Sequence, residues 1–320
     1  MPFQTAASLL REAKYIYISA IGASWNAGIA IQAAFNNVGV PCFLCDASEF
    51  LHFTHIPPES AVIFLSRSGR SIEIVNALPK CRLANASIIS ITNSGDSILA
   101  AGSDICLLTQ VDFDHSISVS TYTSLILTGQ LLALQMKELV WTEEVYISLR
   151  KSFLTIRDSI PSWIEIINSS TWLDENKHTY FIARGMNIAS AHESMLLWEE
   201  GAKQPAAALT TGSFRHGPQE IVNDSINIAI WMEDTVAQDF DRQLVNDLKD
   251  NGVGMLSIGF DLPESLRGIK ISMPPVPKVF NPVINIIPMQ IASEKLALMK
   301  NEDPDNFKFC DFVVEKEGGL

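Results

Sequence analysis

Residues 61–77 read AVIFLSRSGRSIEIVNA, and this stretch decides the fold. Its first five residues are all apolar, which is typical of a strand that is buried on both faces of a parallel sheet. A polar loop that contains Gly69 follows, and from Ile72 onward the pattern favours a helix. A buried strand that leads through a short loop into a helix indicates one βα unit, and such units build parallel sheets covered by helices.

The same alternation continues along the rest of the chain. In the first part, further strands are expected at residues 15–22, 41–47, 86–93 and 104–109, and further helices at residues 24–39 and 121–139. A more highly charged helical connector at residues 143–174 separates this series from a second one. There, strands are expected at residues 178–185, 226–232, 252–259 and 268–273, and helices at residues 189–201 and 283–300. The chain is therefore predicted to be an α/β protein with right-handed crossovers.

One register relates the two series. A constant offset pairs Gly22, at the end of the first strand, with Gly185, and it pairs Ser66 with Ala229 inside a later strand. Two pairs of corresponding positions that share one offset in residue number indicate a duplicated α/β unit. We predict a first, phosphate-binding domain at residues 1–142 and a second domain at residues 143–320 that includes the carboxy-terminal tail.

Composition and charge exclude several classes of function. The chain has 320 residues, of which 47% are hydrophobic, so it can fill two cores and is not intrinsically disordered. Its formal net charge of -13 argues against nucleic acid and anionic membranes as partners. No apolar run reaches the roughly 18 residues that a membrane helix requires, and the first residues do not resemble a signal peptide. A cytoplasmic protein is therefore expected.

The strongest candidate for a functional site is the loop that follows residues 61–65. Hydroxyl groups, a glycine and free backbone N–H groups meet there at a helix N-terminus, which is an arrangement suited to a phosphate. The loop residues expected to bind it are Ser66, Arg67, Ser68 and Ser71. The alternative is a serine-rich helix cap whose arginine extends into solvent.

Two more helix starts are expected at the same edge of the sheet, because the carboxyl ends of parallel strands meet there. Ser24 follows the first strand, and Ser120 lies in the sequence SVST that begins the last helix of the first domain. We expect their hydroxyls to complete a neutral anion cradle. In the second series, the carboxylates of Glu233 and Asp234 take the place of the serine loop, so one phosphate site per chain is predicted.

A second candidate lies in the second series, where residues 212–220 read GSFRHGPQE. His216 stands between an arginine and Gly-Pro in a turn and is a candidate acid or base, and a histidine that only caps a helix is the alternative. Glu199 and Glu200 end the preceding helix, where a solvated carboxylate pair is the usual outcome. Spacing alone does not choose between these two glutamates.

Five cysteines are too few to suggest a disulfide framework. Cys42 and Cys45 form a C-x-x-C motif, but no second pair or histidine set completes a zinc site. The motif lies in an apolar run typical of a strand, where alternation places the two sulfurs on opposite faces. We expect buried core thiols, and the alternative of redox chemistry would need exposed sulfurs at a helix N-terminus. Neither a metal nor a cofactor is expected.

The serine loop, the sequence GAS at residues 22–24 and the sequence SFRHGP at residues 213–218 together resemble the sugar isomerase (SIS) domain family. The resemblance extends over residues 15–315. It is strongest to the tandem-SIS isomerase half of glucosamine-6-phosphate synthase and to the fructosamine-6-phosphate deglycases and amino-sugar-phosphate deaminases. It implies two flavodoxin-like three-layer α/β/α domains with parallel sheets, a phosphosugar ligand, and a homodimer with shared active sites.

The resemblance also implies roles for individual residues. The positions that fall on the family's phosphate-binding residues are Ser24, Ser66, Arg67, Ser68, Ser71 and Ser120. Glu200 falls on the base that forms the enediol, and His216 falls on the ring-opening histidine, which the neighbouring subunit supplies in the synthase. The implied function is an aldose–ketose isomerase, deaminase or deglycase of an amino-sugar 6-phosphate. A non-catalytic phosphosugar sensor is the alternative.

Two departures from the synthase bear on the reaction. No glutaminase segment precedes the first domain, and Met1 is followed by Pro2, so glutamine-dependent amination is not expected. The synthase's tail lysine, which forms a Schiff base, falls here on Cys310 or Phe312, while Lys308 and Lys316 are out of register. The tail and the sequence FRHGP at residues 214–218 look more like those of the deaminase and deglycase relatives.

Overall fold

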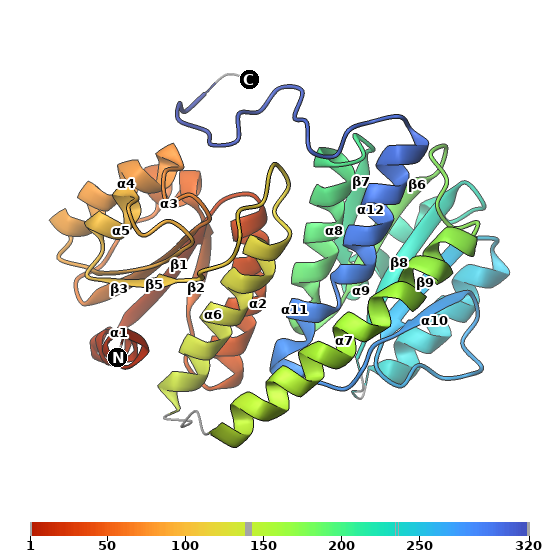
Figure 1. Cartoon of the computed structure of the whole chain (residues 1–320), viewed down its shortest axis with the longest axis horizontal. Coiled ribbons are helices and arrows are strands. Elements are labelled where there is room, and N and C mark those ends of the chain that lie inside the picture. The colour runs from red at the N-terminus through yellow and green to blue at the C-terminus, as the bar shows by residue number, and fades with distance from the viewer. Residues whose placement is uncertain (1, 138–142, 234, 236, 319–320) are drawn as a thin grey trace. The chain divides into compact units, whose positions relative to one another are not determined.

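The chain divides into two units, each with its own parallel sheet, in the computed structural model (Figure 1). The structure describes residues 2–137, 143–233, 235 and 237–318. The first unit combines residues 1–140 with residues 307–320, and the second unit is formed by residues 141–306. The carboxy-terminal tail, which the sequence analysis assigned to the second domain, therefore packs with the first unit.

The sheet of the first unit has five parallel strands in the order β2-β1-β3-β4-β5. At its centre lies β3 (Ser60–Ser66), in which every residue is buried, as the continuous apolar run predicts. The remaining strands are β1 (Tyr15–Ala20), β2 (Phe43–Asp46), β4 (Ser87–Thr92) and β5 (Ile105–Leu108). The parallel order brings the carboxyl ends of β1, β3 and β4 to one edge.

Helices cover both faces of this sheet (Figure 1). On one face α2 and α6 pack against each other, with α1 beside α6, and on the other face α4 packs between α3 and α5. Their bounds are α1 (Pro2–Glu12), α2 (Ala23–Asn37), α3 (Ala47–Phe53), α4 (Ile72–Leu83), α5 (Ile98–Gly102) and α6 (Ser120–Met136).

Close packing holds these helices on the sheet. Gly129 of α6 lies directly against Ile31 of α2, where any Cβ would collide with the isoleucine side chain. On the opposite face, Phe50 of α3 meets Phe64 of β3 edge to face at 5.8 Å, and Ile74 of α4 is fully buried in the same cluster. This apolar contact fixes the start of α4 beside the end of β3.

The sheet of the second unit has the strand order β10-β9-β8-β6-β7. In chain order this is the arrangement of the first unit, with β6 in the place of β1 and β8 in the place of β3. The bounds are β6 (His178–Ala183), β7 (Ala206–Thr210), β8 (Ile226–Met232), β9 (Gly254–Gly259) and β10 (Ile269–Ser272).

Helices of the second unit also cover their sheet. The connector predicted at residues 143–174 is helical, as α7 (Glu143–Ser169), and α12 (Ile287–Met299) packs against both α7 and α8 (Ile188–Glu200). The other helices are α9 (Thr211–Arg215), α10 (Gln238–Asp250) and α11 (Asn281–Ile284), with 3-10 turns η1 (Gly185–Asn187), η2 (Pro218–Ile221) and η3 (Lys278–Phe280).

The predicted three-layer α/β fold with two parallel sheets is confirmed. Gly22 and Gly185 each follow the first strand of their sheet with φ values of 59° and 57°, so the two turns share one backbone conformation. Several elements differ from the expectation, and the helices α1, α3, α5, α9 and α10 were not expected. The strand β7 was not expected, because its alanine-rich, half-buried sequence is atypical of a strand. The helix expected at residues 283–300 is divided into α11 and α12 at Asn285.

Candidate functional site

The serine loop joins the end of β3 to the start of α4. Ser66 is the last residue of β3 and is only 2% exposed, and its Oγ accepts a hydrogen bond from the Gly69 N–H at 3.0 Å. Ser71 is the N-cap residue of α4, and its Oγ lies 3.4 Å from the Oγ of Ser66. Two of the predicted phosphate-binding hydroxyls therefore meet at the N-terminus of α4.

The backbone of this loop is fixed by the neighbouring strand. The Asn93 N–H donates to the Arg67 carbonyl at 3.2 Å, and the Leu99 N–H donates to the Gly69 carbonyl at 3.1 Å. Gly69 has a φ of 62°, in the left-handed region, and its Cα packs against Ser97 so closely that no Cβ fits. The loop therefore has one conformation, which places the Ser68 Oγ where it accepts from the Arg70 N–H at 3.2 Å.

The carboxy-terminal tail binds the side chain of Arg67. The guanidinium group donates to the carbonyl of Phe312 at 3.3 Å and stacks on its ring, with 3.9 Å between the guanidinium carbon and the ring centroid. It also donates to the Ser116 carbonyl at 2.9 Å. The Phe312 ring in turn packs against Phe113, with a centroid separation of 4.7 Å. Arg67 is thus a link between the loop and the tail rather than an arginine extended into solvent.

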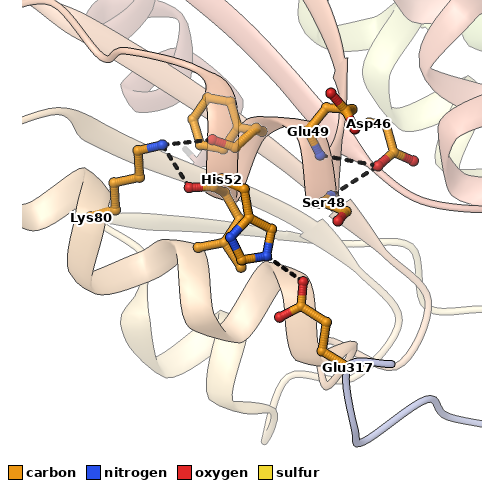
Figure 2. Close-up of polar contacts among 8 residues, drawn as sticks. Asp46, Ser48, Glu49, His52, Lys80 and Glu317 are labelled. Atoms are coloured by element: carbon orange, nitrogen blue, oxygen red, sulfur yellow. Dashed lines mark hydrogen bonds and ion pairs between the residues drawn. The ribbon is translucent and has the colours of Figure 1, made fainter. Parts of the chain in front are cut away.

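Two further contacts attach the tail to this edge of the unit. The Ile72 N–H, in the first turn of α4, donates to the Val314 carbonyl at 3.1 Å. Figure 2 shows the second contact, in which the His52 Nε2 lies 2.5 Å from a carboxylate oxygen of Glu317. The sequence analysis missed the tail as part of the cradle. Its signal was the phenylalanines at 307, 309 and 312, which interrupt an otherwise polar segment.

The helix that carries His52 is itself held at both ends, as Figure 2 shows. The Asp46 side chain caps the start of α3 by accepting from the Ser48 N–H at 2.9 Å. At the other end, the Lys80 ammonium of α4 donates to the carbonyls of residues 50 and 51 at 2.8 and 2.7 Å. The contact to Glu317 is therefore made from a fixed helix.

Ser24 lies where the sequence predicts it, at the start of a helix beside the serine loop. It is half-buried in the first turn of α2, just after β1, and β1 pairs with β3 in parallel. The turn is set by Gly22, whose carbonyl accepts from the N–H groups of Trp25 and Asn26 at 2.9 and 3.1 Å. The Ser24 hydroxyl thus belongs to the same edge of the sheet as Ser66.

The helix start at Ser120 differs from the expectation of a free anion site. The Asp114 carboxylate accepts from the N–H groups of residues 119, 120 and 121 at 3.0, 3.1 and 2.8 Å, and from the Thr121 hydroxyl. These amides of α6 already hold a negative charge, so they do not hold a phosphate. The exposed Ser120 side chain is the part of this helix start that could contribute. Sequence reasoning missed Asp114, which lies six residues before the helix.

The two predicted catalytic residues lie in the second unit. Glu200 is the last residue of α8 and is half-buried, whereas Glu199 beside it is exposed. His216 is exposed in the turn after α9, and its N–H donates to the Ser213 carbonyl at 3.2 Å, so it also occupies the helix-capping position that was the alternative. The structure thus distinguishes the two glutamates, which spacing alone did not.

Sequence reasoning missed a second carboxylate on the same helix. Glu193 is 1% exposed and lies seven residues, or two helical turns, before Glu200. Residues at this spacing share one face of a helix. Buried carboxylates are rare, so Glu193 is a further candidate for a functional or structural role.

The structure gives little support for a metal site, a membrane-spanning helix or a redox site. In the described part of the chain, no three His, Cys, Asp or Glu side chains gather as metal ligands, and no helix is long and apolar enough to cross a membrane. The cysteines are free, and burial raises the pKa of the Cys42 thiol to about 12. A thiol with so high a pKa is a poor nucleophile at neutral pH, which opposes the redox alternative. Cys42 is buried as predicted, and Cys45 is half-buried.

Comparison with solved structures identifies the same fold elsewhere. The carboxy-terminal domain of glucosamine-fructose-6-phosphate aminotransferase from Francisella tularensis superposes with a TM-score of 0.84 at 22% identity, covering 94% of this chain and 88% of that one. Glucosamine-6-phosphate deaminase from Thermotoga maritima gives a TM-score of 0.79 at 20% identity, covering 98% and 94%. Tagatose-6-phosphate ketose/aldose isomerase from Escherichia coli gives 0.76 at 20% identity, covering 95% and 88%.

Sequence comparison leads to the same group. Glutamine–fructose-6-phosphate aminotransferase (isomerizing) from Pyrococcus horikoshii is 26% identical over 317 residues, which are 93% of this chain and 51% of the relative. The enzyme of that name from Pseudomonas aeruginosa is 26% identical over 320 residues, with 94% and 51% covered. The chain thus spans about half the length of these relatives. The family model for the SIS domain matches residues 9–135, which lie in the first unit.

Proposed function

We propose that this chain is an enzyme of an amino-sugar 6-phosphate, acting as an aldose–ketose isomerase, a deaminase or a fructosamine-6-phosphate deglycase. The observation that carries the proposal is the serine loop, where the hydroxyls of Ser66 and Ser71 lie 3.4 Å apart at the N-terminus of α4. Backbone N–H groups at such a site favour an anion. Because the chain has a net charge of -13, this local arrangement and not the overall field would attract the phosphate.

The relatives support the same class of substrate. The names of those with solved structures specify a glucosamine-fructose-6-phosphate aminotransferase, a glucosamine-6-phosphate deaminase and a tagatose-6-phosphate isomerase. All three names contain a sugar 6-phosphate, while the reactions differ. The substrate class is therefore better supported than the choice of reaction. We extend the proposal to the second unit, as a second SIS domain that arose by duplication, because its strand order repeats that of the first.

In the proposed mechanism the two ends of the open-chain sugar have separate tasks. The serine loop holds the phosphate, so binding energy far from the reacting carbons positions them. Glu200 removes a proton from one of the carbons C1 and C2 and returns it to the other, which moves the carbonyl group between them. His216 transfers a proton at the ring oxygen or at the leaving amine. General acid–base catalysis of this kind contributes about 10²–10⁴-fold to the rate.

We also propose a homodimer with shared active sites. His216 lies in an exposed turn, where a second copy of the chain can reach it. A mixture of two inactive variants tests this directly. If subunits exchange and His216 acts in the neighbouring site, mixing Glu200→Gln with His216→Ala restores part of the turnover. Mixtures that stay inactive would place both residues in the same subunit's site.

The experiment that tests the function is a substrate panel with matched variants. Glucosamine-6-phosphate, fructose-6-phosphate with ammonia, and a fructosamine-6-phosphate are each incubated with the protein, and the products are analysed. We expect one of them to be converted, and Glu200→Gln to lower kcat by about 100-fold or more with little change in substrate binding. Glu199→Gln, the exposed neighbour, is the control and should keep its turnover.

The phosphate contact needs its own test. Ser66→Ala should weaken binding of glucosamine-6-phosphate and leave binding of unphosphorylated glucosamine unchanged. Binding of all three compounds without conversion would refute an enzyme and favour a phosphosugar sensor. Full turnover by Glu200→Gln would refute the assignment of the base.

A further inference from the structure

The second unit contains a cavity at the carboxyl edge of its sheet. This position corresponds to that of the serine loop in the first unit. The volume is about 130 Å³, and the lining residues come from the carboxyl ends of β8 and β9 and from the segment after β10. The carboxyl edge of a parallel sheet is where α/β folds bind ligands. Because the two sheets have the same strand order, the cavity beside β8 corresponds in topology to the cradle beside β3.

The charge at this place is reversed between the two units. β3 ends at Ser66 and is followed by Arg67, whereas β8 ends at Met232 and is followed by Glu233. Glu233 lines the cavity, and its Oε1 is buried with no hydrogen-bond partner in the described part of the chain. A buried carboxylate oxygen without a donor is costly, and a bound donor would remove that cost.

Two opposing effects act on the pKa of the Glu233 carboxyl group. Burial raises its pKa, and the positive charge of Lys278, which also lines the cavity, lowers it. Burial has the larger effect, and Lys278 acts against it by favouring the ionised carboxylate. An anionic ligand placed against Glu233 would be repelled by its carboxylate, and the positive charge of Lys278 would offset part of that repulsion.

Two other polar residues of the wall, Asn187 and Asn285, are already committed to the fold, and Asn281 also lines the cavity. The Asn285 side chain donates to the Asn187 Oδ1 at 2.8 Å and accepts from the Ser190 hydroxyl at 2.6 Å. The Asn285 carbonyl accepts from the Trp231 indole N–H at 2.9 Å. These bonds form a fixed, buried network, so this side of the cavity is preorganised and the amides are not available to a ligand without breaking it.

The rest of the wall is apolar. The side chains that provide this surface are Met232, Phe260, Met273, Val276 and Ile284. Hydrocarbon placed against them leaves water, which is favourable in proportion to the area buried. A cavity of this volume holds roughly four waters at about 30 Å³ each, and so a ligand of about four to six non-hydrogen atoms.

From these observations we propose that the second unit has a binding site of its own for a small aliphatic primary ammonium compound. The ammonium group donates to Glu233, and the alkyl chain packs against the methionines and Phe260. The site is separate from the serine loop and does not depend on the proposed reaction. It would let the two units of one chain bind ligands of opposite charge.

The test compares three probes that share one alkyl chain. Butylammonium, butanol and butyrate are titrated into the full chain at constant ionic strength, and binding is followed by ligand-observed NMR. We expect saturable binding of butylammonium, weaker binding of butanol and none of butyrate. Glu233→Gln keeps the shape of the side chain and removes its charge, and it should weaken butylammonium by about tenfold or more, as the loss of a charged hydrogen bond does.

Two further variants keep the test decisive. Glu264→Gln removes an exposed carboxylate of the same unit and should leave binding unchanged. Val276→Phe fills the cavity from its half-buried rim without altering Glu233, and it should abolish binding even if Glu233→Gln folds poorly. Equal binding of the three probes, no saturable binding of butylammonium, or full binding by Val276→Phe would overturn the proposal.

Discussion

A single backbone conformation, that of Gly69, holds the serine loop together at the residue scale. Its φ of 62° is strained for any other residue, and its Cα packs directly on Ser97. We expect Gly69→Ala to lower the free energy of unfolding by about 2–3 kcal/mol, since strain and a steric clash add. Urea denaturation measures this, and a phosphosugar titration should show weaker binding.

A matched glycine separates the two causes. Gly39 has a φ of 78°, and nothing lies near the place of its Cβ, so Gly39→Ala tests backbone strain without a clash. This variant should lose only about 1 kcal/mol and keep phosphosugar binding. If both variants lost the same stability and bound equally well, the contact with Ser97 would have no role in the loop.

The sequence allowed the local part of the cradle to be predicted and left its distant part unseen. Ser66 and Ser71 are five residues apart in one strand–loop–helix unit, so their meeting follows from the βα pattern. Arg67 and Phe312 are 245 residues apart, and no periodicity relates them. The predicted phosphate contact of Arg67 came from its place in the loop and from the family resemblance, whereas its guanidinium group binds the tail.

At the scale of elements, the Asp114 side chain caps the start of α6. The Asp114 carboxylate accepts four hydrogen bonds at this helix start, three of them from backbone N–H groups. We expect Asp114→Ala to lower the free energy of unfolding by about 1–2 kcal/mol, the usual cost of a lost N-cap. Thermal or urea denaturation checks this value.

The control for this prediction is Asp112→Ala, which removes an exposed carboxylate two residues away. It should change stability by less than about 0.5 kcal/mol. Equal losses in the two variants would show that the general charge of this segment, and not the cap, stabilises α6.

Element boundaries were predictable where one physical rule dominates. The buried strands β3 and β8 are continuous apolar runs, and both lie where they were expected. The division between α11 and α12 was missed although the sequence contains a signal for it, because Pro288 lies in the first turn of α12, where proline is favoured and cannot continue a preceding helix. The strand β7 was missed because a half-buried edge has no strong pattern.

For the molecule as a whole, buried thiols predict how stability depends on alkaline pH. Burial raises the pKa of Cys42 and of Cys81 to about 12 from an ordinary value of 9.0. Below pH 9 both states keep the proton. Between pH 9 and 12 the unfolded state loses it first, so stability falls as the pH rises, by up to about 1.4 kcal/mol per pH unit for each thiol.

Urea denaturation from pH 8 to 11 measures this slope. Cys42→Ala removes one of the two thiols, so its stability should fall less steeply with pH, whatever the cost of the small cavity at every pH. Other groups titrate in the same range and contribute equally to both proteins. Parallel curves for the variant and the original chain would contradict a native pKa far above that of the unfolded thiol.

The offset between two landmarks predicted a repeated α/β unit, and the two sheets have the same strand order, but the division of the chain was not predicted. The first unit is built from residues 1–140 and from residues 307–320, so its two parts are separated by the entire second unit. Pattern analysis assigns residues to their sequence neighbours, and for this reason it placed the tail with the second domain.

This discontinuity gives the order of synthesis a physical consequence. A ribosome completes the serine loop early and releases the segment with Phe312 and Val314 only after residues 141–306 have been made. At about 5–20 residues per second, the loop waits roughly 12–48 s for the tail segment that contacts it. During that interval the Ile72 N–H lacks the Val314 carbonyl to which it donates in the complete chain.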